Sequence, residues 1–367
     1  MKNLEATRAL AAQHADDFAA FGISKERVEK LVLAWNERHR AYHDFFHLVH
    51  IIKLIDGDVS TDASTKRMLR VLAWYHDSIY ELLSTENEHR SGKLFLADLN
   101  SDGVSYHSYE DHEMMFNAIV DTADHSGTPS SALSEKFMEY DLHNLIYGSL
   151  PQQIEDGEKI LREYGRFDWT QIKMGRLGAM EKLKKHVLSK NKSSNIEAYI
   201  NFLQGYTPKI AIFPGTFFEY TIGHDDILKR AEKVFDKVIL CPGNNPSKQG
   251  NAERMEYANT TLQSILPNNQ IEPFTGMLWR YVYSKPYPVT VVKGLRNSAD
   301  FETNKLEELF TDEDAAQFGK EKLNSMYIIS SSHLAHVSSS AIRMFDSIQA
   351  SEGTLNSGRS SDRYRVK

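Results

Sequence analysis

Residues 209–231 read KIAIFPGTFFEYTIGHDDILKRA, and this stretch decides the fold of the second half of the chain. Its first residues are apolar and β-prone, its middle contains Pro214 and Gly215, and its end is an amphipathic run that begins at Asp225. The stretch therefore predicts a strand, a glycine-bearing loop and a helix. Such a junction directs backbone N–H groups and the positive end of a helix dipole at one spot, which suits a phosphate. His224 stands at the mouth of the predicted helix, where its imidazole can donate to a phosphate oxygen of a triphosphate.

The pattern PGTFxxxTxGHxDIxxRA, which runs from Pro214 to Ala231, resembles the signature of the nucleotidyltransferase superfamily with a (T/H)xGH motif. Within that superfamily it is most similar to phosphopantetheine adenylyltransferase. Further blocks follow in the order that this family shows: residues 235–239 leading to 245–248, residues 293–296 leading to 300–302, and residues 337–340.

Strands are also expected at residues 237–240 and 289–292, and helical stretches separate them. Strands that alternate with helices imply a parallel sheet with right-handed crossovers. The sequence therefore predicts a doubly wound α/β domain, Rossmann-like, over residues 206–350, with its ligands at the carboxyl edge of the sheet. Residues 351–367 are polar and rich in serine and glycine, which predicts a flexible tail.

The resemblance implies transfer of an adenylyl group from ATP, with Mg²⁺, to a phosphorylated acceptor, foremost 4′-phosphopantetheine, as in coenzyme A biosynthesis. Pyrophosphate leaves, and positioned cations and N–H donors suffice for catalysis. The expected catalytic residues are His224, Thr216, Lys248 and Arg296. The expected nucleotide-binding residues are Pro214, Gly215, Thr216, Phe217, Gly223, His224, Arg296, Ser338, Ser339 and Ser340. The expected acceptor-binding residues are Thr216, Lys248 and Lys293. The triple serine at 338–340 is preferred to the one at 330–332 because of its spacing from Tyr327.

The chain departs from the family pattern in the part of the site that faces the acceptor. Phe218-Glu219 replaces an Asp-Pro pair, and Lys293 replaces an arginine, which keeps the charge but loses the bidentate fork. Asn304 replaces a glutamate, and Gly276 replaces an aspartate. A different acceptor, such as nicotinamide mononucleotide or a polyol phosphate, with adenylyl or cytidylyl transfer, therefore stays open as an alternative.

The first half of the chain has a helical pattern almost throughout. Prolines are scarce up to residue 203, and apolar residues recur at intervals of three and four. Ser24 has the position of a helix N-cap. The sequence therefore predicts an all-α domain over residues 1–205.

Histidine spacing marks a second candidate site in this domain. His43 and His47 are four residues apart, which would place them on one face of a helix. His76 and Asp77 follow an apolar helical run, and both can ligate a metal if neighbouring helices supply the other ligands. An imidazole beside a carboxylate suits a borderline or hard divalent cation.

Five blocks in this half resemble the HD superfamily of metal-dependent phosphohydrolases. They are YHxxxH at 42–47, WYHDxIYE at 74–81, Asn87-Glu88 with Ser91, Thr122 with His125, and Tyr140-Asp141-Leu142. The resemblance implies the metal ligands His47, His76, Asp77 and Asp141, and the pocket residues His43, Glu88 and His125. The implied ion is a divalent transition metal (Mn²⁺, Fe²⁺, Ni²⁺ or Zn²⁺), and the implied reaction is hydrolysis of a phosphate ester or anhydride.

Composition limits the classes of function. The chain has 367 residues, a net charge of −7, 41% hydrophobic residues and a single cysteine. These values are typical of a cytoplasmic globular protein without a nucleic-acid surface, and no apolar run is long enough for a membrane span. We expect a bifunctional enzyme that binds ATP and a small phosphorylated acceptor. The resembled transferases commonly form homo-oligomers (hexamers), whereas this sequence, with its fused helical domain, leaves the oligomeric state open. The alternative from another class is that one domain is an inactive nucleotide- or metal-binding regulatory module.

Overall fold

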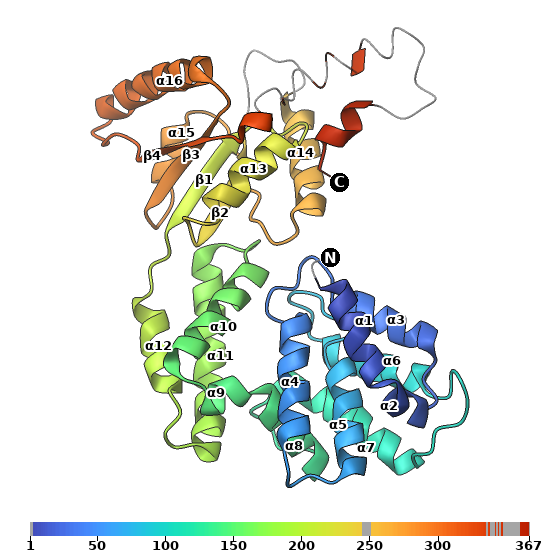
Figure 1. The fold of residues 1–367 in the computed structure, drawn as a ribbon. Coiled ribbons are helices and arrows are strands. Elements are labelled where there is room, and N and C mark those ends of the chain that lie inside the picture. Colours follow the sequence, from blue (N-terminus) through green and yellow to red (C-terminus); the bar gives the residue numbers. More distant parts are fainter. Residues whose placement is uncertain are drawn as a thin grey trace. The chain divides into compact units, whose positions relative to one another are not determined.

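The computed structural model describes residues 3–243, 251–334, 337, 342, 344, 346–347 and 360–366, with backbone only at 251–255 and 360. The chain divides into two compact units (Figure 1). The helical unit comprises Met1–Tyr164 and Trp169–Tyr206, and the α/β unit comprises Gly165–Asp168 and Thr207–Lys367. None of the described helices has both the length and the apolar character needed to cross a membrane.

The helical unit agrees with the predicted all-α architecture. Its α-helices are α1 (Leu4–Gln13), α2 (Ala15–Ala20), α3 (Lys25–Ala34), α4 (Phe45–Gly57), α5 (Ala63–Tyr75), α6 (Asn87–Asp98), α7 (Tyr109–Asp121), α8 (Ala132–Asp141), α9 (His143–Tyr147), α10 (Leu150–Glu163), α11 (Trp169–Lys190) and α12 (Ile196–Gly205). Helix α5 is central to the core, because every residue from Val71 to Tyr75 is buried. The end of α5, where His76 and Asp77 follow, therefore lies deep in the unit.

Side-chain caps fix the starts of α3 and α4, and the start of α4 decides how His43 and His47 are placed. Ser24 caps α3, as predicted, since its hydroxyl accepts the N–H of Arg27 at 3.4 Å. Asp44 caps α4 in the same way, with its carboxylate accepting the N–H of Phe46 at 2.8 Å. Helix α4 therefore begins at Phe45. The prediction that His43 shares a helix face with His47 is wrong, because His43 precedes the cap.

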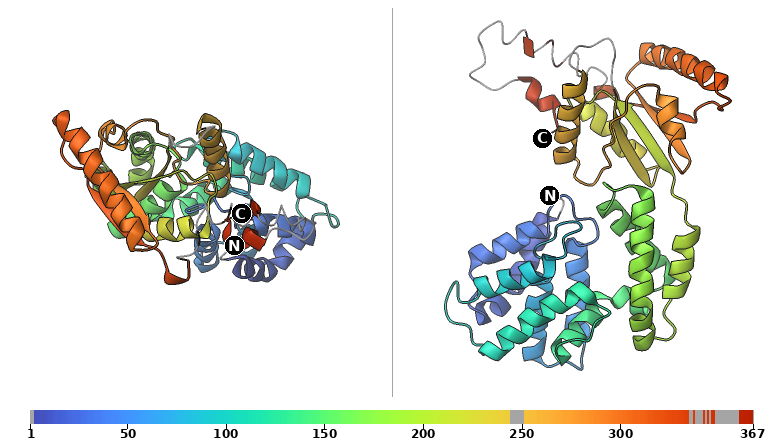
Figure 2. Two further views of the ribbon diagram at one scale, coloured as in Figure 1. Left: turned by 90° about the horizontal axis from the view of Figure 1, so that it is seen from above. Right: turned by 180° about the vertical axis from the view of Figure 1, so that it is seen from behind.

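The α/β unit contains, within the described residues, a four-stranded parallel sheet in the order β2-β1-β3-β4. Figure 2 shows this unit from above and from behind. Its strands are β1 (Ile210–Gly215), β2 (Lys237–Pro242), β3 (Val289–Leu295) and β4 (Ser325–Ile329). Its α-helices are α13 (Ile222–Ala231), α14 (Asn251–Ile265), α15 (Leu278–Tyr283) and α16 (Ser298–Gln317). The parallel sheet agrees with the Rossmann-like α/β fold predicted for this unit, and β4 is a strand that no sequence pattern had indicated.

Helices cover both faces of this sheet. Ile227 and Leu228 of α13 join one buried cluster with Ala211 and Phe213 of β1. Cys241 points to the opposite face, where its thiol contacts the hydroxyl of Tyr281 at 3.4 Å. Alternate residues of β1 and β2 are thus buried on both sides, as expected for a doubly wound sheet.

Two short segments of the α/β unit have positions that no sequence pattern indicated. Residues 165–168 belong to the α/β unit, and the buried ammonium of Lys237 donates to the carbonyl oxygen of Phe167 at 2.9 Å. Residues 360–364 form a 3₁₀ helix, and Arg365 forms an antiparallel bridge with Thr221. This part of the predicted flexible tail is therefore ordered, because Val366 packs into the apolar cluster of the α/β unit.

Helices α10 and α12 approach closely at Gly157, whose missing side chain leaves room for Tyr199. We predict that Gly157→Ala destabilises the helical unit, because the added carbon would collide with the Tyr199 hydroxyl and overpacking costs about 1–3 kcal/mol. Gly178→Ala in α11 is the matched control, since its new carbon would meet no atom and helix propensity should stabilise it by up to about 1 kcal/mol. Denaturant unfolding followed by circular dichroism measures both. Equal stabilisation by the two substitutions would contradict this packing.

Candidate functional site

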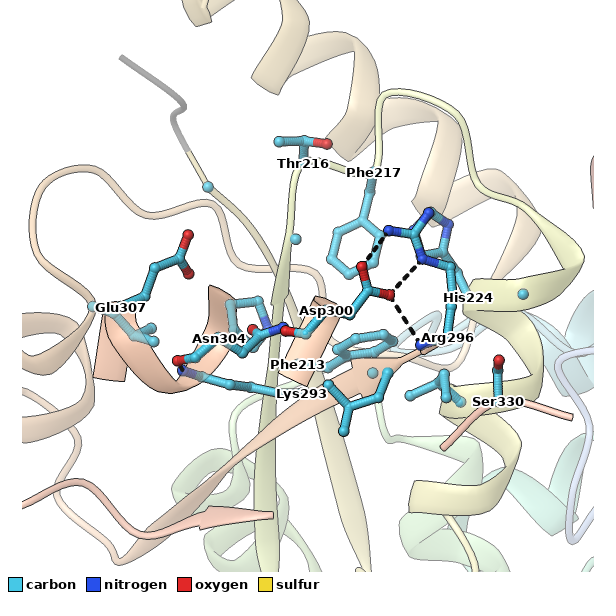
Figure 3. Close-up of a pocket in the computed structure, with 18 of the residues that line it drawn as sticks. Phe213, Thr216, Phe217, His224, Lys293, Arg296, Asp300, Asn304, Glu307 and Ser330 are labelled. Carbon is cyan, nitrogen blue, oxygen red and sulfur yellow. Dashed lines mark hydrogen bonds and ion pairs between the residues drawn. The ribbon is translucent and has the colours of Figure 1, made fainter. Parts of the chain in front are cut away.

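A cavity of about 790 Å³ lies at the carboxyl ends of β1 and β3, beside the start of α13 (Figure 3). The predicted site residues that line it are Pro214, Gly215, Thr216, Phe217, Gly223, His224, Lys293 and Arg296. Lys248, Ser338, Ser339 and Ser340 lie outside the described residues. Ser330 lines the cavity too, although its triple serine was set aside on spacing. The apolar run at residues 326–329, had it been taken as a strand, would have marked Ser330 as the residue directly after it, at the ligand-binding edge.

Hydrogen bonds fix the imidazole of His224. Helix α13 begins at Ile222 rather than at Asp225, so His224 occupies its first turn. The hydroxyl of Thr221 accepts the N–H of His224 at 3.3 Å, and the N–H of Thr221 donates to Nδ1 of His224 at 3.2 Å. Because Nδ1 accepts this bond, the neutral imidazole carries its proton on Nε2. The Thr221 hydroxyl, 3.1 Å from Nδ1, can donate to the same nitrogen, and the tautomer inferred from these contacts leaves Nε2–H as the donor.

Aromatic rings hold the same imidazole on its sides. The Phe217 ring meets it edge to face at 5.3 Å between centroids, and the Tyr220 ring stacks on it at 5.8 Å. Phe217 adopts a left-handed backbone conformation, with φ of 41°, and its ring occupies the space where a side chain at Gly215 would be. Gly215 is therefore required by a close approach.

Charge in the cavity is divided between two ends (Figure 3). At one end, Arg296 forms a bidentate ion pair with Asp300, with both N–O distances 2.7 Å. Burial, and secondarily the positive charge of Arg296, lower the pKa of His224 to about 4. At the other end, the ammonium of Lys293 donates to the carbonyl oxygen of Asn304 at 3.2 Å. The neutral imidazole therefore stands beside the Arg296–Asp300 ion pair, and its Nε2–H and the N–H groups at the start of α13 are donors suited to an anionic ligand.

Comparisons with known proteins agree with this geometry. Residues 212–345 match the family model for cytidylyltransferase-like proteins. The phosphopantetheine adenylyltransferase of Cytophaga hutchinsonii is 35% identical over 139 residues, which are 37% of this chain and 87% of that protein. The chain belongs to the phosphopantetheine adenylyltransferase family. The family member of Natranaerobius thermophilus is 34% identical over 138 residues, 37% of this chain and 81% of that protein.

Other members of the phosphopantetheine adenylyltransferase family match over a shorter range. The protein of Clostridium tetani is 39% identical over 95 residues, which are 25% of this chain and 59% of that protein. All three matches cover less than half of the chain, and the matched family model begins only at residue 212. The family therefore accounts for the α/β unit, and the helical unit has to be interpreted from its own residues.

The helical unit brings the four predicted metal ligands together. Candidate ligand atoms of His47, His76 and Asp77 all lie within 4.8 Å of one another. Asp141 joins them, because its Oδ1 is 2.9 Å from Nε2 of His47 and 3.7 Å from Nε2 of His76. These residues come from α4, the end of α5 and the end of α8.

The donor set fits a divalent cation. The Nε2 atoms of His47 and His76 are buried and make no aligned hydrogen bond within the described part of the chain, although carboxylates face them. Burial lowers the pKa of His76, but Asp77 and Asp141 outweigh it and raise that pKa to about 9. Burial opposes ionisation of Asp77 as well, yet His76 and His43 hold its pKa below the ordinary value. The fold therefore favours positive charge at this place, with imidazole nitrogens and carboxylate oxygens as ligands.

The predicted pocket residues lie around this cluster. His125 Nε2 is 2.6 Å from Oδ2 of Asp141. Glu88 is partly buried, and burial, together with the charge of Asp77, raises its pKa. The ring of His43 lies edge to face with that of His47, at 5.8 Å between centroids.

Glu163 is a residue of this site that sequence reasoning missed. Its Oε2 accepts the backbone N–H groups of Ala41, Tyr42 and His43 at 2.8, 2.9 and 3.1 Å, and its Oε1 is 2.6 Å from Nδ1 of His43. Burial opposes its charge, but His43 and the other hydrogen bonds lower the pKa of Glu163 to about 2. No local pattern connects a glutamate in α10 with the loop before α4. The carboxylate fixes both that loop and the ring of His43.

We predict that Glu163→Ala destabilises the helical unit by about 3–5 kcal/mol, because it leaves three backbone N–H groups and the half-buried imidazole of His43 without their acceptor. Glu158→Ala, an exposed site on the same helix, should stay within about 0.5 kcal/mol of the parent. Denaturant unfolding measures both variants. Similar small losses would show that the Glu163 contacts contribute little.

We also predict that His224 stays neutral far below the pH at which an ordinary histidine titrates. Its lowered pKa of about 4 means that the unfolded chain binds the proton first as pH falls. The associated stability is present above pH of about 6.5 and is lost as pH falls towards about 4. NMR titration of the imidazole, assigned by difference from His224→Gln, measures the midpoint. A midpoint near the ordinary value would contradict the described environment.

Proposed function

We propose that the α/β unit transfers the adenylyl group of ATP to a small phosphorylated acceptor, with 4′-phosphopantetheine as the leading candidate. The observation that carries this proposal is the Nε2–H donor of His224, fixed in the cavity at the start of α13. A neutral donor at a helix N-terminus beside Arg296 suits a triphosphate. Membership of the phosphopantetheine adenylyltransferase family supports the adenylyl donor and the acceptor.

The reaction needs positioning more than it needs covalent chemistry. A phosphate oxygen of the acceptor attacks the α-phosphorus, the bond from that phosphorus to its bridging oxygen breaks, and pyrophosphate leaves with the electron pair. Negative charge increases on the α-phosphoryl oxygens and on the leaving group. The Nε2–H of His224 and the first N–H groups of α13 are donors for that charge. Arg296 lies at the same end of the cavity, paired with Asp300, and would have to turn its guanidinium from that carboxylate to contact the triphosphate. Mg²⁺ accompanies ATP as part of the substrate.

The acceptor end of the cavity is formed by different residues. Lys293 lies there with Asn304 and Glu307 (Figure 3), and its ammonium suits the phosphate of the acceptor. Gly276 has φ of 82°, and a side chain carbon at this position would meet no atom. The cavity is therefore open where the family carries an aspartate, so nicotinamide mononucleotide and a polyol phosphate remain the competing acceptors.

The experiment is pyrophosphate release from ATP with Mg²⁺, measured with 4′-phosphopantetheine, nicotinamide mononucleotide and glycerol phosphate in parallel. We expect release with 4′-phosphopantetheine and a loss of about 10²–10³-fold in kcat in His224→Ala, with ATP binding retained. His333→Ala, an exposed histidine of the same unit, is the control and should keep its activity. Release with another acceptor alone would change the substrate, and near-normal turnover of His224→Ala would refute the site.

For the helical unit we propose a divalent transition metal held by His47, His76, Asp77 and Asp141, and hydrolysis of a phosphate ester or anhydride. The buried, unaligned Nε2 atoms of the two histidines carry this proposal. A bound divalent cation polarises a phosphoryl oxygen and lowers the pKa of a water molecule. Around the cluster, His125 orients Asp141 through its 2.6 Å contact, while Glu163 orients the ring of His43.

Metal content gives a test that does not depend on activity. We predict that purified protein loaded with Mn²⁺ retains the ion after dialysis, and that His76→Ala lowers its affinity by at least about tenfold. His89→Ala, whose side chain is 43% exposed and pairs with Glu86, is the control. Loss of metal in both variants, or in neither, would contradict the ligand set. Retained metal without hydrolysis of any phosphate compound would favour the regulatory module.

A further inference from the structure

Residues 360–366 lie against the loop that leads into α13. Arg365 forms an antiparallel bridge with Thr221, and the N–H of Val366 donates to the carbonyl oxygen of Tyr220 at 3.3 Å. Thr221 is the residue whose backbone and hydroxyl hold His224. The backbone of this segment is thus paired with the backbone that fixes the imidazole.

Hydrogen bonds of the Arg365 side chain hold this contact in place. One nitrogen, Nη2, donates to Oε1 of Glu219 at 3.1 Å and also to the carboxylate of Asp346. The other, Nη1, donates to Ser361 Oγ at 2.9 Å and to Asp362 Oδ1 at 2.8 Å. The Arg365 side chain is only 19% exposed, and the Glu219 side chain 15%. Charge-assisted bonds at such low exposure are stronger than those of a surface pair.

Apolar contacts flank this ion pair on both sides. Val366 packs against the cluster that contains Phe217 and Tyr220, the two rings that enclose His224. Tyr364 packs against the smaller cluster around Leu334. Consecutive residues of one segment therefore contact both the ring-bearing loop and the rim of the cavity.

The backbone conformation of Thr221 acts directly on the imidazole of His224. Thr221 has an extended backbone, with φ of −107° and ψ of 161°, as its role of helix cap requires. The bridge with Arg365 pairs that extended backbone, and the bond from Val366 holds the residue before it. Release of either contact would loosen the two hydrogen bonds that select the Nε2–H tautomer.

We propose that Arg365 and Val366 are positioning residues of the transferase site, and that the pair of Arg365 with Glu219 is needed to hold His224 in its donor orientation. This inference rests on the proposed adenylyl transfer. Arg365 acts through Thr221 and Tyr220 and has no role in contacting the substrate. Substituting Arg365 leaves every residue of the Thr-x-Gly-His motif in place, so a change in turnover would report the positioning of His224 and not the loss of a motif residue.

The test compares Arg365→Gln with Arg363→Gln, an exposed arginine two residues away that stacks on Tyr364. We expect Arg365→Gln to lower kcat by about tenfold to a hundredfold, the cost of a misplaced group, while KM for ATP changes by no more than about twofold. Arg365→Lys should recover part of the loss, and Arg363→Gln should match the parent. Glu219→Gln removes the same ion pair by replacing its carboxylate, and it takes the place of Arg365→Gln in the test if that variant does not fold.

A second readout does not require turnover. The nitrogen NMR shifts of the His224 imidazole report its tautomer, and we expect the pure Nε2–H form in the parent and a mixture in Arg365→Gln. A parental spectrum together with parental kcat would overturn the proposal. A fall in kcat with an unchanged spectrum would overturn it as well, because Arg365 would then act by another route. If the parent turns over no acceptor, the proposed function fails, and the spectrum still decides whether Arg365 and Val366 position His224.

Discussion

The pair of hydrogen bonds between Thr221 and His224 is the constraint on which the transferase site depends. It ends the loop, starts α13 and assigns the imidazole proton to Nε2. Burial beside Arg296 then keeps the ring neutral, so that it donates without carrying a charge of its own. A protonated ring would repel Arg296, and the other tautomer would break the cap. One local motif thus joins the fold to the chemistry.

The helical unit uses the opposite electrostatic arrangement. There, the carboxylates of Asp77 and Asp141 lie beside buried imidazoles and favour positive charge. The carboxylate of Glu163 pairs with the imidazole of His43. The α/β unit lines its cavity with basic side chains and N–H donors, whereas the helical unit gathers carboxylates and imidazoles in a buried cluster. Each arrangement is consistent with the function proposed for its unit.

Local patterns could be predicted from the sequence, and long-range contacts could not. The apolar run before Pro214 and the Thr-x-Gly-His motif predicted β1 and the mouth of α13, because strand, turn and cap signals act over a few residues. His43 was misplaced because the cap at Asp44 competes with helical spacing. Glu163 and Arg365 were missed because each acts on a loop more than a hundred residues away. Such partners are chosen by the tertiary fold and leave no periodic signal.

The position of ATP in a crystal structure tests the central claim most directly. Crystals of the full chain grown with a non-hydrolysable ATP analogue and Mg²⁺ would show where the triphosphate binds. We predict that the α-phosphate lies at the start of α13, within hydrogen-bonding distance of Nε2 of His224, with Arg296 at the same end of the cavity. A triphosphate bound at the Lys293 end, or outside this cavity, would contradict it.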